Sequence, residues 1–155
     1  MNPIFHFLFN YLFIELVFGT AWENIIVIII ASLLIDFTHL PYLMKVKSGV
    51  VNERFGSECR TRFHEIYGLA VFSLLLCVIY TFFDPMTTSI AALCLVLHFA
   101  LDFVAGKSMP FYPYDKTEVL LGLMPYGYKK KILFEVSTTI LLGVVFWLKI
   151  KSFIL

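Results

Sequence analysis

The stretch "MTTSIAALCLVLHFALDFVA", residues 86–105, decides the fold, because it is a mostly apolar run with the length of a membrane span. A helix rises about 1.5 Å per residue and the hydrocarbon core is about 30 Å thick, so a span needs about 20 residues. The run nevertheless contains His98 and Asp102, and ionisable side chains in hydrocarbon need a partner or a function. The segment therefore predicts a transmembrane helix that contributes to a polar site.

The composition of the whole chain places it in the same class. Of its 155 residues, 60% are hydrophobic and only 15% are charged, whereas about 25% of the residues in a soluble domain are charged. The length suits one domain. The basic residues lie in separate loops beside the membrane rather than in a stripe, which argues against nucleic-acid binding. We expect an all-α, polytopic integral membrane protein with a single domain.

Four other apolar segments join this one, so the sequence predicts about five transmembrane helices. They are expected at residues 3–19, 24–43, 63–83, 86–105 and 131–150. The first segment is interrupted by His6, Asn10 and Glu15, which we interpret as contacts between helices. It lacks a basic n-region and a small-residue cleavage pattern, so we expect a retained helix rather than a signal peptide. Asp84-Pro85 favours a tight turn between the third and fourth helices.

The basic residues predict an orientation in the membrane. Except for Lys149 and Lys151, every Lys and Arg lies in or beside the loops that follow the second and fourth predicted helices. Cytoplasmic loops carry an excess of Lys and Arg, so both loops are expected inside the cell. We therefore expect a protein of the cell's inner membrane. Its N-terminus would lie in the cytoplasm and its C-terminus outside.

Two pairs of imidazole and carboxylate groups lie near the predicted cytoplasmic ends of helices. Asp36 and His39 are three residues apart, and His98 and Asp102 are four residues apart. Residues at these spacings share one face of a helix, so both side chains of each pair can contact the same bound group. The sequence therefore predicts two half-sites, on the second and fourth helices, at the same membrane face.

A third group opens the third predicted helix, where His64 is followed by Glu65. This helix also begins on the cytoplasmic side, so we expect all three groups to converge there. The depths match less well, because His98 lies about 10 Å inside the predicted end of its helix while His64 lies at the membrane surface. A cavity open to the cytoplasm would accommodate this difference.

Imidazole and carboxylate ligands together suit zinc, and also iron or manganese. A catalytic zinc site has three protein ligands and one open position. We predict a divalent metal ion, zinc before the others, with one ion better supplied with ligands than two. Some of the carboxylates can instead orient a histidine ligand, and Glu65 and Asp102 are the candidate catalytic bases. The predicted metal ligands are Asp36, His39, His64, His98 and Asp102.

Three motifs resemble, in order and spacing, those of the YdjM-like family of membrane-bound metal-dependent hydrolases. The motifs are "LLIDFTHLP" at 33–41, "CRTRFHE" at 59–65 and "HFALDFVAGKSMPFYP" at 98–113. The family patterns are Asp-x-Asp-His, His-Arg-Gly-x-Thr-His-Ser and His-x-x-x-Asp followed by Gly and a Pro-aromatic stretch. The resemblance implies metal-dependent hydrolysis in a helical membrane protein, and all five predicted ligands match family positions.

The chain departs from the family pattern at three positions. Thr38 stands at the second acidic position of the first motif, Cys59 at the first histidine position of the second, and Glu65 at its final serine. A cysteine thiolate can still bind zinc. The resemblance therefore implies a divergent member, in which activity or metal preference can differ.

Three functions are compatible with the predicted site. A hydrolase would act on a membrane lipid or lipid-linked ester, amide or phosphoester that enters from the cytoplasmic leaflet. An ion or proton transporter would use the same groups as a path, and would need polar groups through the full depth of the bilayer. A non-catalytic membrane subunit would use them as helix contacts or a structural metal site. The sequence specifies neither the substrate nor the oligomeric state.

Overall fold

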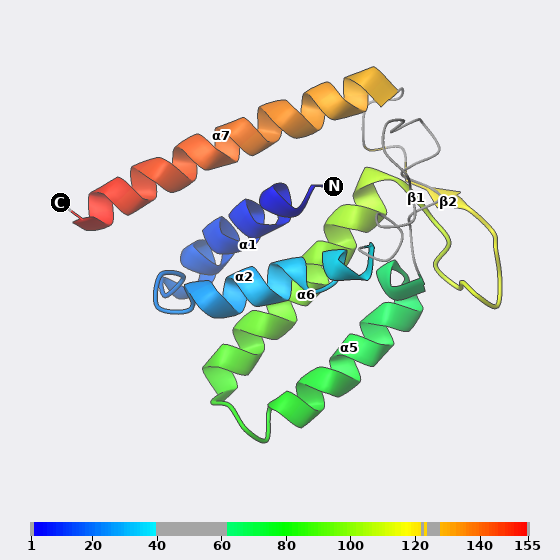
Figure 1. The fold of residues 1–155 in the computed structure, drawn as a ribbon, viewed down its shortest axis with the longest axis horizontal. Coiled ribbons are helices and arrows are strands. Elements are labelled where there is room, and N and C mark those ends of the chain that lie inside the picture. Colours follow the sequence, from blue (N-terminus) through cyan, green and yellow to red (C-terminus); the bar gives the residue numbers. More distant parts are fainter. Residues whose placement is uncertain (1, 40–61, 122, 124–127, 155) are drawn as a thin grey trace.

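The computed structural model describes residues 2–39, 62–121, 123 and 128–154 as a single all-α domain (Figure 1). Its elements, in chain order, are α1 (Pro3–Phe18), α2 (Ile25–Leu33), the 3₁₀ turns η1 (Asp36–His39) and η2 (Arg62–His64), α5 (Ile66–Ile79), α6 (Pro85–Ala105), the strands β1 (Lys107–Ser108) and β2 (Val119–Leu120), and α7 (Tyr128–Ile154). Each of the five predicted helices corresponds to one observed helix.

Helices α1, α2 and α6 pack against one another and form the centre of the domain. Their shared core includes Ile14, Ile28 and Ile90, which have no exposed surface. α5 packs against α6 on one side of this centre and α7 against α1 on the other (Figure 1). The histidine-bearing ends of α1 and α6 therefore belong to this centre, where His6 and His98 are fully buried.

Local sequence explains where the long helices begin. The Asn2 side chain accepts a hydrogen bond from the third residue of the first turn of α1, which satisfies an otherwise orphaned N–H group. Asp84 does the same for α6, and Pro85 occupies the first helical position, where its missing N–H costs nothing. The predicted Asp84-Pro85 turn is therefore confirmed. α1 ends at Gly19, whose φ of 66° is the left-handed conformation that glycine adopts most readily.

Among the described residues, two helices are long and apolar enough to cross a bilayer, within Pro85–Ala105 and Lys129–Ser152. The apolar stretches at Pro3–Phe18, Ile25–His39 and Ile66–Ile79 are shorter. The prediction of helices is thus confirmed in kind and position, whereas five full spans are not shown. No residue in the apolar stretch of α7 is buried, so this helix presents apolar side chains outward all along its length, as a lipid-facing helix does.

α2 ends earlier and α5 begins later than the sequence predicts. α2 stops at Leu33, where residues up to 43 were expected to continue it, and the chain passes into the η1 turn. Within this turn the Thr38 hydroxyl donates to the carbonyl oxygen of Ile35 at 2.7 Å. Residues 40–43 lie outside the described part of the chain.

The predicted third helix is likewise divided, into η2 and α5. A Cβ atom at Gly68 would overlap the carbonyl group of Phe63, so the absence of a side chain there lets η2 fold back against the first turn of α5. This close approach sets the position of His64, the last residue of η2.

α1 and α7 run in the same direction along each other. The Asn2 side chain donates to the Thr139 hydroxyl at 3.1 Å, and Lys149 forms an ion pair with Glu15 at 3.7 Å near the other end of α1. The N-terminus and the C-terminal end of α7 therefore lie toward opposite ends of the domain (Figure 1). After α6, the strands β1 and β2 form an antiparallel pair that the sequence analysis did not predict.

Candidate metal centre

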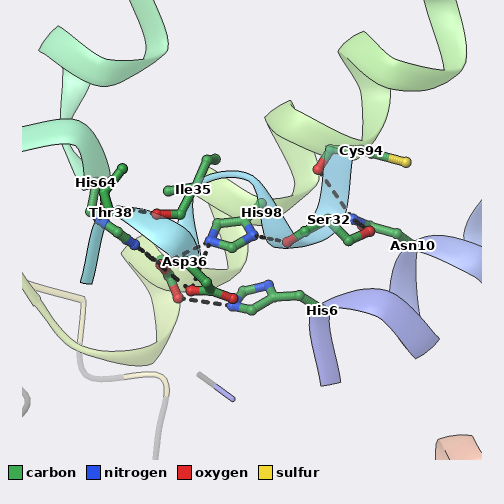
Figure 2. Close-up of polar contacts among 10 residues, drawn as sticks. His6, Asn10, Ser32, Ile35, Asp36, Thr38, His64, Cys94 and His98 are labelled. Carbon is green, nitrogen blue, oxygen red and sulfur yellow. Dashed lines mark hydrogen bonds and ion pairs between the residues drawn. The ribbon is translucent and has the colours of Figure 1, made fainter. Parts of the chain in front are cut away.

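All four histidines of the chain come together with Asp36 and Asp102. Figure 2 shows His6, Asp36, His64 and His98 from this cluster. They form three overlapping groups of three, and within each group the ligand-type atoms lie within 4.8 Å of one another. The groups are His6, Asp36 and His98; Asp36, His39 and His64; and His64, His98 and Asp102. The predicted convergence of residues from distant parts of the sequence is therefore observed for all five predicted ligands.

Two nitrogens and two oxygens form the centre of the cluster. Nε2 of His98 lies 3.4 Å from Oδ2 of Asp102 and 3.7 Å from Oδ1 of Asp36. Nε2 of His64 lies 3.8 Å from the same Asp36 oxygen and 3.9 Å from the same Asp102 oxygen. Each imidazole nitrogen thus faces both carboxylates.

These separations fit ligands that share a cation better than they fit hydrogen bonds. An N–H···O hydrogen bond spans about 2.7–3.2 Å, which is shorter than all four distances. Two ligand atoms that are each about 2.0–2.2 Å from one zinc ion in tetrahedral geometry lie about 3.3–3.6 Å apart. The four observed nitrogen–oxygen distances fall within this range or exceed it by a few tenths of an ångström. Small movements of the side chains would therefore let all four atoms bind one ion.

The orientation of His98 is fixed by a backbone carbonyl. Its Nδ1 lies 2.9 Å from the carbonyl oxygen of Ser32, and a carbonyl can only accept, so Nδ1 bears the hydrogen. In the neutral imidazole Nε2 then has a free lone pair. This nitrogen is buried and has no hydrogen-bond partner in the part of the chain that the structure describes, and the residue is 0% exposed. A ligand histidine is normally held in this way, through its other ring nitrogen.

The side chain of Ser32 takes part in a second polar contact, with Asn10 (Figure 2). The Asn10 amide donates to the Ser32 hydroxyl at 2.8 Å and to the carbonyl oxygen of Cys94 at 3.2 Å. All three residues are buried, and they belong to α1, α2 and α6. The interpretation of Asn10 as a contact between helices is confirmed, and its position one turn from His6 links this contact to the cluster.

The sequence did not predict that His6 belongs to the cluster. It was interpreted as a contact between helices, and it is one, because its Nε2 lies 3.1 Å from Oδ1 of Asp102 on α6. Its ring also stacks on that of His98, with centroids 3.8 Å apart. The bond to Oδ1 leaves the other Asp102 oxygen directed at His64 and His98. The available signal was its position, since His6 lies at the same predicted cytoplasmic end as the other histidines.

His39 and Thr38 flank His64 on the η1 side. The His39 ring stacks on the His64 ring, with centroids 4.0 Å apart. The Thr38 hydroxyl oxygen lies 3.5 Å from Nδ1 of His64, so the threonine at the family's acidic position contacts a candidate ligand. The His64 and His98 rings are 6.0 Å apart, so the predicted difference in depth does not keep them from sharing a site.

Glu65 lies apart from the three ligand groups, although it is buried. One carboxylate oxygen accepts a hydrogen bond from the Ser108 hydroxyl at 2.6 Å, and the other accepts one from the Met109 N–H at 3.1 Å. Asp102, the other predicted base, lies inside the cluster. The catalytic role of Glu65 stays a prediction, and Cys59 lies outside the described residues.

The fold and the cluster together define an all-α protein. Its described residues include two helices long and apolar enough to span a membrane, and histidine and aspartate side chains that could hold a metal ion. Comparison with protein-family models, with characterised proteins and with solved structures finds no match to this chain. The resemblance to the YdjM-like hydrolases therefore remains an expectation that rests on the three sequence motifs.

Proposed function

We propose that this protein is a metal-dependent hydrolase of the inner membrane, which acts on a lipid or lipid-linked ester, amide or phosphoester at the cytoplasmic leaflet. One observation carries the proposal: the Nε2 atoms of His64 and His98 both face carboxylate oxygens of Asp36 and Asp102 at 3.4–3.9 Å. A donor set of two imidazoles and carboxylates suits zinc.

The burial of the four residues suggests a division of roles. His64, His98 and Asp102 are buried and form one of the three ligand groups, which supplies the three protein ligands typical of a catalytic zinc. Asp36 is slightly more exposed, with 13% of its side-chain surface accessible against 10% for Asp102. We therefore assign the metal to the first three residues and place Asp36 at the open side of the site.

A bound zinc ion would polarise the scissile group and make water a stronger nucleophile at neutral pH. Oδ2 of Asp36 is buried and has no hydrogen-bond partner among the described residues, so it can take the proton from the attacking water. The same oxygen can then pass that proton to the leaving oxygen or nitrogen. His6 holds Asp102 and the Ser32 carbonyl holds His98, so the proposed ligands stay in place during these transfers.

The surroundings of the cluster support a substrate with an apolar part. Phe37, beside Asp36, and Ile66, two residues after His64, are both largely exposed. If the positive-inside prediction is correct, these side chains lie at the cytoplasmic membrane surface, where acyl chains can reach them. Cysteines introduced singly at Phe37 and at Lys151, in a variant whose Cys59, Cys77 and Cys94 are replaced by alanine, test this orientation by labelling in intact cells. Reagents that do not cross the membrane should modify the residue 151 variant only.

Metal analysis of the detergent-purified protein tests the proposal. We expect about one zinc ion per chain in the wild type and almost none in the His98→Ala variant. Glu23→Gln, which alters an exposed carboxylate, is the matched control and should retain the metal. A wild-type protein that contains no metal and takes up none on addition of zinc, with His98→Ala indistinguishable from it, would contradict the proposal.

A structural metal site in a non-catalytic subunit is the second candidate. It is favoured by the four central atoms, because four protein ligands complete a tetrahedral shell and leave no open position. Removal of zinc distinguishes the two: a structural site should unfold the protein, whereas a catalytic site should leave a folded apoprotein. Transport is less well supported, since the described interior beyond Asn10 is filled by Ile14, Ile28 and Ile90.

A further inference from the structure

Glu65 links two segments that are far apart in the chain. Its carboxylate is 5% exposed and accepts hydrogen bonds from the Ser108 hydroxyl and the Met109 N–H. The next residue, Ile66, donates its own N–H to the carbonyl oxygen of Pro110 at 3.3 Å. Three hydrogen bonds therefore join residues 65–66 to the loop that follows α6.

These contacts explain why a carboxylate is buried here. A buried carboxylate is costly unless hydrogen-bond donors compensate its charge, and bonds to an ionised acceptor are stronger than neutral ones. Ser108 is itself 1% exposed, so water does not compete for its hydroxyl. Both Glu65 oxygens are thus used to hold the loop.

The two linked segments each bear a candidate metal ligand. His64 directly precedes Glu65 and ends η2, which is a single short 3₁₀ turn. Asp102 lies on the last turns of α6, which leads directly into the loop that Glu65 holds. Nε2 of His64 and Oδ2 of Asp102 are 3.9 Å apart. The hydrogen bonds between Glu65 and the loop therefore help to set the distance between His64 and Asp102.

We propose that Glu65 is a positioning residue for the metal site: it clasps Ser108 and Met109, and thereby holds His64 in reach of the ion that Asp102 and His98 bind. This inference rests on the proposed function for its metal readout, but the clasp itself can be measured without metal. It replaces the catalytic role that the sequence suggested for Glu65 with a purely geometric one.

The test compares Glu65→Ala with Glu65→Gln. The Gln amide can accept from the Met109 N–H with its oxygen and donate to the Ser108 hydroxyl with its nitrogen, so it can keep both bonds without the charge. Zinc affinity, measured by competition with a chromophoric chelator, should fall about 10- to 100-fold in Glu65→Ala and stay within a few-fold of wild type in Glu65→Gln. Glu23→Ala, at an exposed carboxylate, is the control.

Hydrogen exchange measured by mass spectrometry provides the readout that needs no metal. Peptides that cover residues 106–112 should exchange faster in Glu65→Ala and at the wild-type rate in Glu65→Gln. Ser108→Ala removes one of the two side-chain bonds and should give an intermediate loss of zinc affinity. This milder variant decides the question if Glu65→Ala does not fold.

Three results would overturn the inference. Wild-type zinc affinity in Glu65→Ala, or in Ser108→Ala, would show that the clasp is dispensable. Equal losses in Glu65→Gln and Glu65→Ala would show that the charge itself is required, as for a ligand. If the wild-type protein binds no zinc, the proposed function fails, and the exchange rates alone judge the clasp: unchanged exchange in Glu65→Ala rejects it.

Discussion

Nε2 of His98 lies 3.4 Å from Oδ2 of Asp102, one turn later on α6, yet the two atoms are not hydrogen bonded. The hydrogen of His98 is on the opposite ring nitrogen, where the Ser32 carbonyl accepts it. Two electron-rich atoms therefore face each other in a buried site. Such an arrangement is costly unless a cation or a proton lies between them, and this pair is the basis of the metal-site proposal.

Asp36 and Asp102 should respond differently to loss of charge. Asp102→Asn weakens one of the three proposed ligands, so we expect most of the bound zinc to be lost. Asp36→Asn keeps those ligands and removes the proposed proton acceptor, so zinc should be retained while hydrolysis falls at least about 100-fold. Zinc content and turnover of a lipid ester or phosphoester, measured on both variants, check this. Equal zinc loss in both variants would place Asp36 among the ligands.

His6 should act on the metal site through Asp102. His6→Ala removes the 3.1 Å bond to the Asp102 carboxylate, and loss of such an orienting partner typically costs about 10- to 100-fold in metal affinity. His6→Gln can restore the bond with its amide N–H, and should recover part of the affinity. Isothermal titration with zinc measures both variants. If His6→Ala abolishes binding altogether, His6 is itself a ligand.

Gly68 should be intolerant of a side chain. Gly68→Ala places a Cβ against the Phe63 carbonyl group, so η2 must move and take His64 with it. We expect a loss of about 2 kcal/mol or more in the free energy of unfolding, together with weaker zinc binding. Gly143→Ala on α7 is the control, because its added Cβ would meet only a Leu8 side-chain atom at 3.9 Å. This control should be neutral, or stabilising by up to about 1 kcal/mol. Similar melting temperatures for the two variants would contradict the packing described here.

Asn10 should contribute to stability rather than to chemistry. Asn10→Ala removes two hydrogen bonds and leaves the Cys94 carbonyl and the Ser32 hydroxyl without this donor, at a cost of about 1–3 kcal/mol. Asn24→Ala removes one bond to the Thr20 carbonyl in a partly exposed turn, and should cost less. Thermal unfolding in detergent, followed by circular dichroism, compares the two. A smaller effect at Asn10 than at Asn24 would contradict the proposed supporting role.

Much of this architecture could be predicted because it depends on short-range sequence. The lengths of the apolar runs specified five helices, and Asp84-Pro85 specified the start of α6. The spacing of His98 and Asp102 put both side chains on one face of that helix, where the structure has them. The helix ends were less predictable, since α2 stops at Leu33 within an apolar run that hydropathy alone would continue to residue 43.

The sequence by itself determined that this chain is apolar and helical and that its histidines and aspartates lie at matching helix ends. Only the tertiary structure decided that His6 bonds to Asp102 and that Glu65 holds Ser108, partners separated by 96 and 43 residues in the chain. The reason is physical: periodicity and capping act within one or two helical turns, whereas these contacts depend on how α1, η2 and α6 pack together. A side chain's neighbours across a helix interface are set by that packing, and the local sequence does not encode them.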